Sequence, residues 1–260
     1  MIPYKGVDVN FSLEGKTAII TGGTAGLGYA TADFLSKKGV NLILMARSPD
    51  VDNAAKKIGA KNIGVQGDVC DSACRKKVLD AGIKAFGKVD ILINNAGISM
   101  LDNAESISEE YWNKVIGVNL TACFLMAQLF GAYLIENKLT GSIVNVSSQA
   151  GVSALEKHVA YCASKAGVNS ITRVLALEWG KYGIRVNAVS PTVVLTELGR
   201  RVWDNPKGEE VKKILPSGRF VEPDEVAGAI AFLCSDAAAM ITGHNLMVDG
   251  GACTVVTKFE

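Results

Sequence analysis

A tyrosine and a lysine four positions apart, Tyr161 and Lys165, have the chemistry of a proton-transfer pair. Residues four apart on a helix share one face, so the two side chains are expected to lie close together. A tyrosine is ordinarily a poor acid or base near neutral pH, but a neighbouring ammonium group stabilises its phenolate form. Such a tyrosine could give a proton to a carbonyl oxygen or take one from an alcohol. The alternative is a core tyrosine beside a surface lysine.

A glycine-rich turn, TGGTAGLG at residues 21–28, follows a predicted strand and opens a predicted helix. Gly22 permits a tight turn, Gly26 lets the backbone approach a pyrophosphate, and Gly28 lets the helix pack closely on the strand. The N-terminus of the helix favours the negative charge of that group. This context predicts a dinucleotide site rather than a glycine turn without a ligand. The expected contacts in the turn are Gly22, Thr24, Gly26, Leu27 and Gly28.

The end of the second predicted strand distinguishes the two nicotinamide cofactors. An Asp or Glu at this place would bind the ribose 2′-hydroxyl of NAD. This chain has Arg47 and Ser48 instead. A guanidinium group can bind a 2′-phosphate through two hydrogen bonds, whereas a carboxylate would repel it. The pattern therefore favours NADP(H), with NAD(H) possible if Arg47 is an ordinary surface residue.

With 48% apolar residues, 20% charged residues and a formal net charge of +1, the 260-residue chain has the composition of a soluble globular protein. The near-neutral charge argues against a nucleic-acid partner, and no apolar run approaches the roughly 18 residues of a membrane span. The N-terminus lacks the apolar block of a signal peptide. No His or further Cys lies near Cys70 and Cys74, and one pair of thiols cannot close a tetrahedral metal site. We expect reduced, mostly buried thiols, no metal and a cytoplasmic protein.

Short apolar runs alternate with longer amphipathic stretches along the chain. This alternation predicts an α/β protein: a single-domain (1–260), Rossmann-like, doubly wound fold with a seven-stranded parallel sheet and helices on both faces. Residues 96–108 and 191–222 lie at the sheet edge where such folds bind ligands, and 191–222 is expected to be a substrate loop or lid. The expected strands are 17–21, 41–45, 62–65, 91–94, 142–147, 185–189 and 246–248, and the expected helices are 27–38, 73–86, 109–137, 159–181 and 224–234.

Five motifs in the same order resemble the short-chain dehydrogenase/reductase family over residues 13–251. They are the glycine turn, Asn94-Asn95-Ala96-Gly97, Asn119, Ser147-Ser148 and Tyr161-x-x-x-Lys165. The resemblance implies that Tyr161 transfers the proton and that Lys165 also holds the nicotinamide ribose. Asn119 is implied to kink its helix and to hold a water that links Lys165 to solvent. Ser148, thirteen positions before Tyr161, is implied to hydrogen-bond the carbonyl oxygen, with Ser147 as the alternative.

The same resemblance implies further contacts to the dinucleotide. Asp68 and Val69 match the family's positions beside the adenine, and the segment from Pro191 matches the loop against the nicotinamide amide. Many family members have glycine where Thr192 stands, which leaves the backbone geometry of that loop open. Asn95 is expected to support the sheet rather than touch substrate. The implied cofactor-binding residues outside the glycine turn are Arg47, Ser48, Asp68, Val69, Asn95, Ala96, Gly97, Tyr161, Lys165, Pro191, Val194 and Thr196.

The substrate side resembles the L-xylulose (dicarbonyl) reductases and related sugar-alcohol dehydrogenases of this family. Beside Ser148, Gln149 and His158 would bond sugar hydroxyls and Trp203 would cover them. The alternatives are a loop residue, a helix-start residue and an apolar anchor, respectively. The resemblance implies NADPH-dependent reduction of a small ketose or dicarbonyl. An NAD-linked polyol or hydroxysteroid dehydrogenase and a catalytically silent dinucleotide-binding regulator are the competing hypotheses.

The predicted helices 109–137 and 159–181 carry apolar residues on more than one face, so they need more cover than one sheet face provides. In the resembling family these two helices form a dimer interface, and tetramers are common. We therefore expect a homotetramer, with the tail after Gly251 near a neighbouring subunit.

Overall fold

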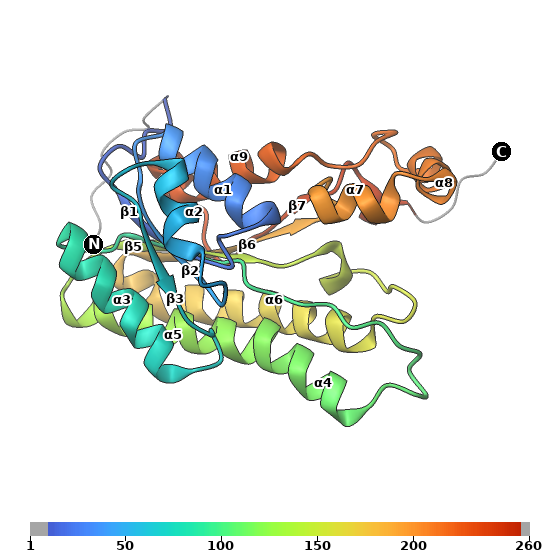
Figure 1. Ribbon diagram of the computed structural model, residues 1–260, viewed down its shortest axis with the longest axis horizontal. Coiled ribbons are helices and arrows are strands. Elements are labelled where there is room, and N and C mark those ends of the chain that lie inside the picture. Colours follow the sequence, from blue (N-terminus) through green and yellow to red (C-terminus); the bar gives the residue numbers. More distant parts are fainter. Residues whose placement is uncertain (1–9, 256–260) are drawn as a thin grey trace.

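The computed structural model describes residues 10–255, which form a parallel seven-stranded sheet in the order β3-β2-β1-β4-β5-β6-β7 (Figure 1). The strands are β1 (Thr17–Thr21), β2 (Asn41–Ala46), β3 (Ile63–Gln66), β4 (Ile91–Asn94), β5 (Gly141–Val146), β6 (Ile184–Pro191) and β7 (Asn245–Val248). The predicted fold is therefore confirmed. The expectation that no signal peptide occupies the N-terminus concerns residues 1–9 and lies outside the described residues, as do residues 256–260 of the tail.

Helices cover both faces of the sheet, as the doubly wound prediction requires (Figure 1). One face carries α1 (Gly26–Lys37), α2 (Val51–Ile58) and α9 (Pro223–Cys234), and the other carries α3 (Ser72–Phe86), α5 (Ala122–Glu136) and α6 (Val159–Trp179). Neighbouring strand residues point to opposite faces. Ile20 and Leu44 therefore pack in the apolar core under α1, α2 and α9, whereas Ile19 and Ile43 pack in the apolar core under α3, α5 and α6.

The segment 191–222 contains two short helices, α7 (Glu197–Trp203) and α8 (Pro206–Ile214). The hydroxyl of Thr196 accepts a hydrogen bond from the backbone amide of Gly199 and so caps the first helix. The side chain of Asn205 caps the second in the same way. These caps pair amide groups that a helix start would otherwise leave free. Residues 191–222 are therefore not an irregular loop but a folded segment with two helices, which is called the cover below.

The predicted helix 109–137 consists of α4 (Glu109–Ile116) and α5 joined by a π-helical turn, Gly117–Thr121. By length and composition alone, the continuous helix Glu109–Glu136 could cross a membrane. Core helices of soluble proteins pass the same test, and 44% of its most apolar 18-residue window is buried within the protein. We interpret it as a core helix, because Phe130 and Leu134 are fully buried against the sheet.

A buried chain of polar side chains fixes α5 and α6 to the sheet. Asn94 Nδ2 donates to Asn145 Oδ1 at 2.9 Å and to the carbonyl of Cys123 at 3.2 Å. Asn145 Nδ2 in turn donates to Thr172 Oγ1 at 2.9 Å. Buried polar groups cost stability unless they are paired, so this chain favours a single placement of the two helices.

The cysteines are free thiols, but the expectation that most of them are buried is wrong: two are buried, Cys74, Cys162 and Cys253 are half-buried, and one is exposed. Cys123 and Cys234 are buried, and burial raises the pKa of each thiol to about 12. Cys70, in contrast, is exposed, because it lies in the turn after β3. Within residues 10–255, no group of three or more His, Cys, Asp or Glu side chains could hold a metal ion.

Candidate active site

A cleft of about 530 Å³ opens beyond the carboxyl ends of β1 and β4, where the strand order reverses. Ligands of open α/β sheets bind at such switch points, because the flanking connections leave in opposite directions. The described residues that line the cleft are Gly22, Ala25, Gly26, Leu27, Gly28, Asn95, Ala96, Gly97, Thr196, Glu197, Leu198 and Arg201.

The glycine turn has the geometry that a dinucleotide requires. A Cβ on Gly28 would stand 2.2 Å from the carbonyl oxygen of Gly22. Gly22 and Gly26 have φ angles of +68° and +55°, which disfavour other residues. No side chain caps α1 at Ala25, so the first backbone amides of the helix are free to bind a diphosphate. The residues present therefore fit the predicted cofactor.

Asn95 joins the two strands of the switch point. Its Nδ2 donates to the carbonyls of Thr21 and Gly22 at 3.0 and 3.1 Å. The Thr21 hydroxyl accepts hydrogen bonds from the backbone amides of Asn95 and Ala96, both at 3.0 Å. The Asn95 amide group thus holds the glycine turn in place, in keeping with its predicted supporting role.

The residues predicted to contact the adenosine half of the cofactor follow β2 and β3. Arg47 is exposed, and its carbonyl accepts a hydrogen bond from Gln66 Nε2 at 3.1 Å, which fixes the backbone there. Sequence reasoning missed Arg75, which is buried with 7% exposure and donates to the carbonyl of Val69 at 2.6 Å. This bond orders the turn that carries Asp68 and Val69. The available signal was its spacing, since Arg75 lies three and four positions before Val78 and Leu79 on the buried face of α3.

The segment after β6 reaches the glycine turn. Pro191 ends the strand and is buried, and Val194 forms an isolated parallel bridge with Val221. The methyl group of Thr196 lies 3.6 Å from the place where Gly26 would carry a Cβ. The predicted nicotinamide loop therefore approaches the cleft, and Thr196 lines it.

Lys165 and Tyr161 meet on one face of α6, as their spacing predicts. The lysine is only 4% exposed, its Nζ donates to the carbonyl of Val146 at 2.7 Å, and this nitrogen lies 5.6 Å from the tyrosine ring centroid.

The Ser147 hydroxyl is buried and donates to the carbonyl of Lys165 at 3.2 Å. Ser148 is only partly buried, and its hydroxyl accepts from the amide of Ala150 at 3.1 Å. These contacts favour Ser148 over Ser147 as the serine that meets a substrate.

Asn119 lies in the π-helical turn, which is the disruption of the helix expected from the resemblance. Its Oδ1 accepts from the backbone amide of Ile98 at 2.8 Å, and its Nδ2 donates to the Ile98 carbonyl and to the Ser164 hydroxyl at 2.9 and 3.1 Å. A Cβ on Gly97 would lie 3.4 Å from Asn119 Oδ1 and 3.6 Å from Lys165 Nζ. The turn therefore brings Asn119 beside the ammonium group. The water relay stays a prediction.

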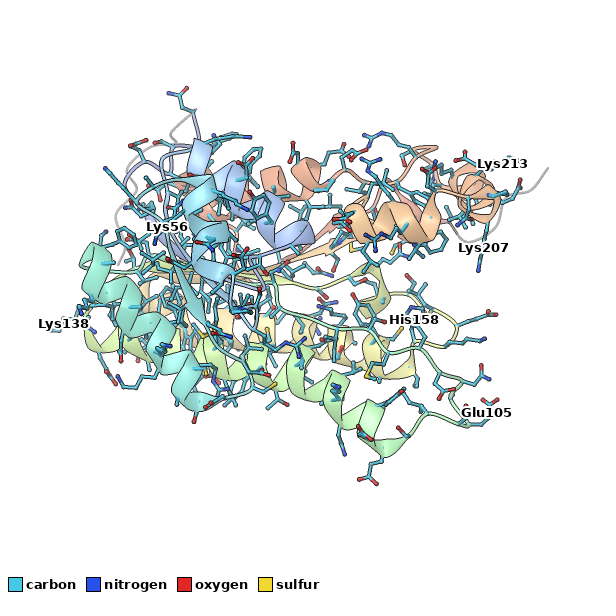
Figure 2. All side chains as sticks on the ribbon, in the orientation of Figure 1. Lys56, Glu105, Lys138, His158, Lys207 and Lys213 are labelled. Atoms are coloured by element: carbon cyan, nitrogen blue, oxygen red, sulfur yellow. The ribbon has the colours of Figure 1, made fainter. Side chains whose placement is uncertain are left out.

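The two loops beyond the cleft are tied to each other. The backbone amide of Asp102 donates to the carbonyl of Lys157 at 3.1 Å. His158, the next residue, presents its ring to Tyr161 with centroids 6.1 Å apart. Figure 2 shows His158 toward the same end of the molecule as Glu105, opposite the end that carries Lys138. The imidazole thus lies beside the proton-transfer pair.

Gln149 and Trp203, the other two residues predicted to contact the substrate, have different surroundings. The Oε1 atom of Gln149 is buried and has no hydrogen-bond partner among the described residues. Trp203 packs edge to face on Phe220 with ring centroids 5.6 Å apart, and Phe220 is 1% exposed. In this structure Trp203 has the contacts of an apolar anchor, and its predicted role as a lid stays a prediction.

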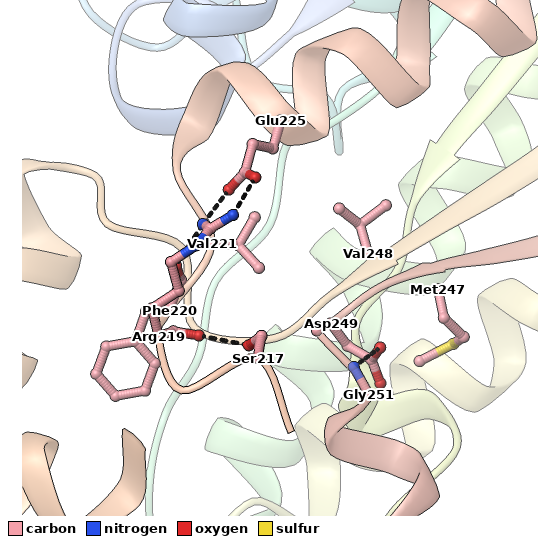
Figure 3. A pocket seen from close by; sticks show the side chains of 10 residues that line it. Ser217, Arg219, Phe220, Val221, Glu225, Met247, Val248, Asp249 and Gly251 are labelled. Carbon is pink, nitrogen blue, oxygen red and sulfur yellow. Dashed lines mark hydrogen bonds and ion pairs between the residues drawn. The ribbon is translucent and has the colours of Figure 1, made fainter. Parts of the chain in front are cut away.

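A second cavity, of about 300 Å³, lies between the segment 217–221 and the end of β7 (Figure 3). Arg219 forms two hydrogen bonds with Glu225 on its rim, and the buried Asp249 accepts from the backbone amide of Gly251. The amide of Ser217 donates to the carbonyl of Gly250. These contacts fasten the cover to the sheet. None of the residues predicted for cofactor or substrate is among those described as lining this cavity.

Comparison with known proteins assigns the family. A family model described as enoyl-(acyl carrier protein) reductase matches residues 22–253. The chain belongs to the short-chain dehydrogenase/reductase family. It is an oxidoreductase that acts on CH–OH groups with a dinucleotide cofactor, as the motifs predict.

Curated members of the short-chain dehydrogenase/reductase family match nearly the whole chain. An NAD-dependent glycerol dehydrogenase of Listeria innocua is 47% identical, covering 95% of this chain and 98% of its own. A D-threitol dehydrogenase of Mycolicibacterium smegmatis is 46% identical, with 94% and 95% covered. An L-xylulose reductase of Caenorhabditis elegans is 37% identical, with 93% and 97% covered.

Solved structures of the family agree with the fold. The crystal structure of a candidate NAD(P)-dependent gluconate 5-dehydrogenase from Beutenbergia cavernae has a TM-score of 0.86 to this chain at 33% identity. The match covers 94% of this chain and 99% of that one, which holds NADP at low occupancy.

Replacing Gly28 with alanine is expected to remove dinucleotide binding, because the new methyl group would stand 2.2 Å from the carbonyl oxygen of Gly22 and 2.5 Å from Asn95 Nδ2. Fluorescence titration with NADPH and NADH measures the loss. Gly117→Ala is the matched control, since a Cβ there meets nothing within 4 Å. Unchanged affinity in Gly28→Ala would contradict the role assigned to the turn.

Proposed function

We propose that the protein interconverts a short polyol and its ketose, or reduces a small dicarbonyl, with NADP(H) as the preferred cofactor. The observation that carries this proposal is the buried Lys165 ammonium group beside Tyr161, at the carboxyl edge of a sheet whose glycine turn fits a dinucleotide. A catalytically silent binding protein would have no need of that pair.

The chemistry divides between the cofactor and the chain. A nicotinamide dinucleotide in the cleft supplies or accepts the hydride. The Tyr161 hydroxyl gives a proton to the carbonyl oxygen during reduction and takes one from the alcohol during oxidation. Lys165 stabilises the phenolate that remains, and its own position is fixed by the carbonyl of Val146. Ser148 hydrogen-bonds the same substrate oxygen and orients its carbon toward the nicotinamide.

Polar groups near the pair support a hydroxylated substrate. The buried Gln149 Oε1 could accept a hydrogen bond from a sugar hydroxyl, since it has no described partner. The His158 ring lies beside Tyr161, where it could bond a second hydroxyl. The names of the relatives above, which refer to glycerol, D-threitol and L-xylulose, point to the same substrate class. A hydroxysteroid would instead require a broad apolar wall.

The cofactor preference rests on the end of β2. Arg47 is exposed there, free to bind a 2′-phosphate, and this place has no carboxylate that would hold a ribose hydroxyl and repel the phosphate. NADP is bound in the solved relative, whereas the Listeria relative is NAD-dependent, so NAD(H) is the alternative.

Exposed apolar side chains support a homotetramer. Leu177 and Val174 on α6 are 84% and 49% exposed, and Tyr111 and Trp112 on α4 are also exposed. Each of the two predicted interface helices therefore presents apolar side chains that the rest of the described chain leaves exposed. A second copy of the chain would cover them.

A substrate screen tests the proposed function directly. We expect oxidation of NADPH with short ketoses or α-dicarbonyls, and reduction of NADP with the matching polyols. Gln149→Leu should raise KM about tenfold with little change in kcat, because it removes a hydroxyl contact rather than the proton transfer. Efficient turnover of steroid ketones with none on any ketose or dicarbonyl would reject the substrate class.

Tyr161→Phe is expected to lower kcat at least about 100-fold and to leave cofactor affinity nearly unchanged, because it removes only the proton donor. Stopped-flow absorbance and fluorescence titration measure the two effects. Tyr182→Phe is a matched control, because Tyr182 also lies under a lysine, with Lys181 Nζ 5.0 Å from its ring centroid. A tenth of the original turnover in Tyr161→Phe would show that another group transfers the proton.

Arg47→Asp should weaken NADPH about 100-fold and NADH far less, since it exchanges attraction for repulsion at the 2′-phosphate alone. The dissociation constants of both cofactors give the ratio. Lys138→Asp makes the same change in net charge and should alter neither, because Lys138 precedes β5 at the amino edge of the parallel sheet, whereas Arg47 follows β2 at the carboxyl edge. Equal weakening of the two cofactors by Arg47→Asp would place Arg47 elsewhere.

Light scattering at micromolar concentration is expected to give the mass of four chains. Val174→Asp, which puts a charge on the exposed apolar face of α6, should lower that mass because a buried unpaired charge is costly. A monomeric native protein would contradict the proposed assembly.

A further inference from the structure

The first helix of the cover, α7, lies over the part of the cleft where the diphosphate is expected. Glu197, Leu198 and Arg201 of this helix line the cleft together with the glycine turn. Arg201 carries the only positive charge among the described lining residues, and none of the motif-based predictions includes it. A cation facing a turn built for a diphosphate is a feature that the function above does not use.

Close packing fixes this helix beside the glycine turn. At its start, the Thr196 methyl group lies 3.6 Å from the position of a Cβ on Gly26. One turn later, a Cβ on Gly199 would stand 2.0 Å from the carbonyl oxygen of Val194, so only glycine lets the helix sit this close to the preceding segment. The start of α7 is therefore held beside the glycine turn, and Arg201 follows one turn later among the residues that line the cleft.

The guanidinium group of Arg201 is free to exchange its partner. It pairs with Glu197 at 2.6 Å, but the two side chains are 74% and 86% exposed. Exposed pairs of this kind contribute little stability, so leaving the glutamate costs little. A diphosphate carries two negative charges and offers a guanidinium group several oxygens in a suitable geometry.

We propose that Arg201 binds the diphosphate of the dinucleotide, exchanging Glu197 for the phosphate oxygens and holding the cover over the bound cofactor. This inference rests on the proposed function, because it requires a dinucleotide in the cleft. The site then has contacts from both sides: backbone amides of α1 on one and a side-chain cation of α7 on the other. Because both cofactors contain the diphosphate, Arg201 strengthens NADH and NADPH binding equally, whereas Arg47 distinguishes between them.

The test compares two neighbouring arginines of one helix. Arg201→Gln is expected to raise the dissociation constants of NADH and NADPH about tenfold each, and that of ADP similarly, with adenosine unaffected. Arg200→Gln is the matched control, because Arg200 pairs with Glu222 at 2.7 Å and does not line the cleft. It should change each constant less than twofold. Added salt should weaken cofactor binding more in the native protein than in Arg201→Gln.

A double variant separates direct binding from charge neutralisation. If Arg201 only neutralises Glu197, then Glu197→Gln combined with Arg201→Gln restores native affinity; if it binds the diphosphate, the double variant stays weak. Restored affinity in the double variant, or unchanged affinity in Arg201→Gln, overturns the inference while the proposed function stands. A native protein that binds neither NADH nor NADPH overturns the proposed function itself. Melting temperatures of all variants establish that each is folded.

Discussion

The hydrogen bonds between Thr21 and Asn95 are the contacts on which the cleft depends. β1 and β4 pair as far as Ile20 and Ile93, and at the switch point their connections then leave toward opposite faces of the sheet, which opens a gap between the segments that follow the two strands. The Asn95 side chain closes this gap by donating to two carbonyls of the glycine turn. Position 28 must then be glycine, since the Asn95 amide nitrogen occupies the space that a Cβ at this position would need.

The regular part of the fold was predictable because buried parallel strands have continuous apolar sequences. Elements with weaker patterns were missed. α2 is only eight residues long, so its pattern is short, although Val51, Ala54 and Ala55 are spaced along one face and are buried. α7 and α8 have polar compositions and are held by capping and tertiary contacts, to which periodicity is insensitive. The π-helical turn arises from the bonds of Asn119 to residue 98, a pairing that no local pattern contains.

For the site, spacing was sufficient where partners share one element and insufficient where they do not. Tyr161 and Lys165 meet because they lie one turn apart on α6. The carbonyl of Val146 that holds the lysine comes from a strand, so its role emerges only from the packing of helix on sheet. Arg75 was overlooked for the same reason: its partner, the carbonyl of Val69, becomes visible only when the turn after β3 is folded.

The bond between the Asp102 amide and the Lys157 carbonyl joins two loops through backbone atoms alone. A connection of this kind depends little on which side chains the two residues carry, except that proline at position 102 would remove the donor and β-branched residues are disfavoured at position 157, where φ is +62°. Side chains around the substrate can therefore change while the frame that holds them keeps its shape. In evolutionary terms, one scaffold could pass from one polyol to another by point substitutions, without first having to rebuild the mouth of its pocket.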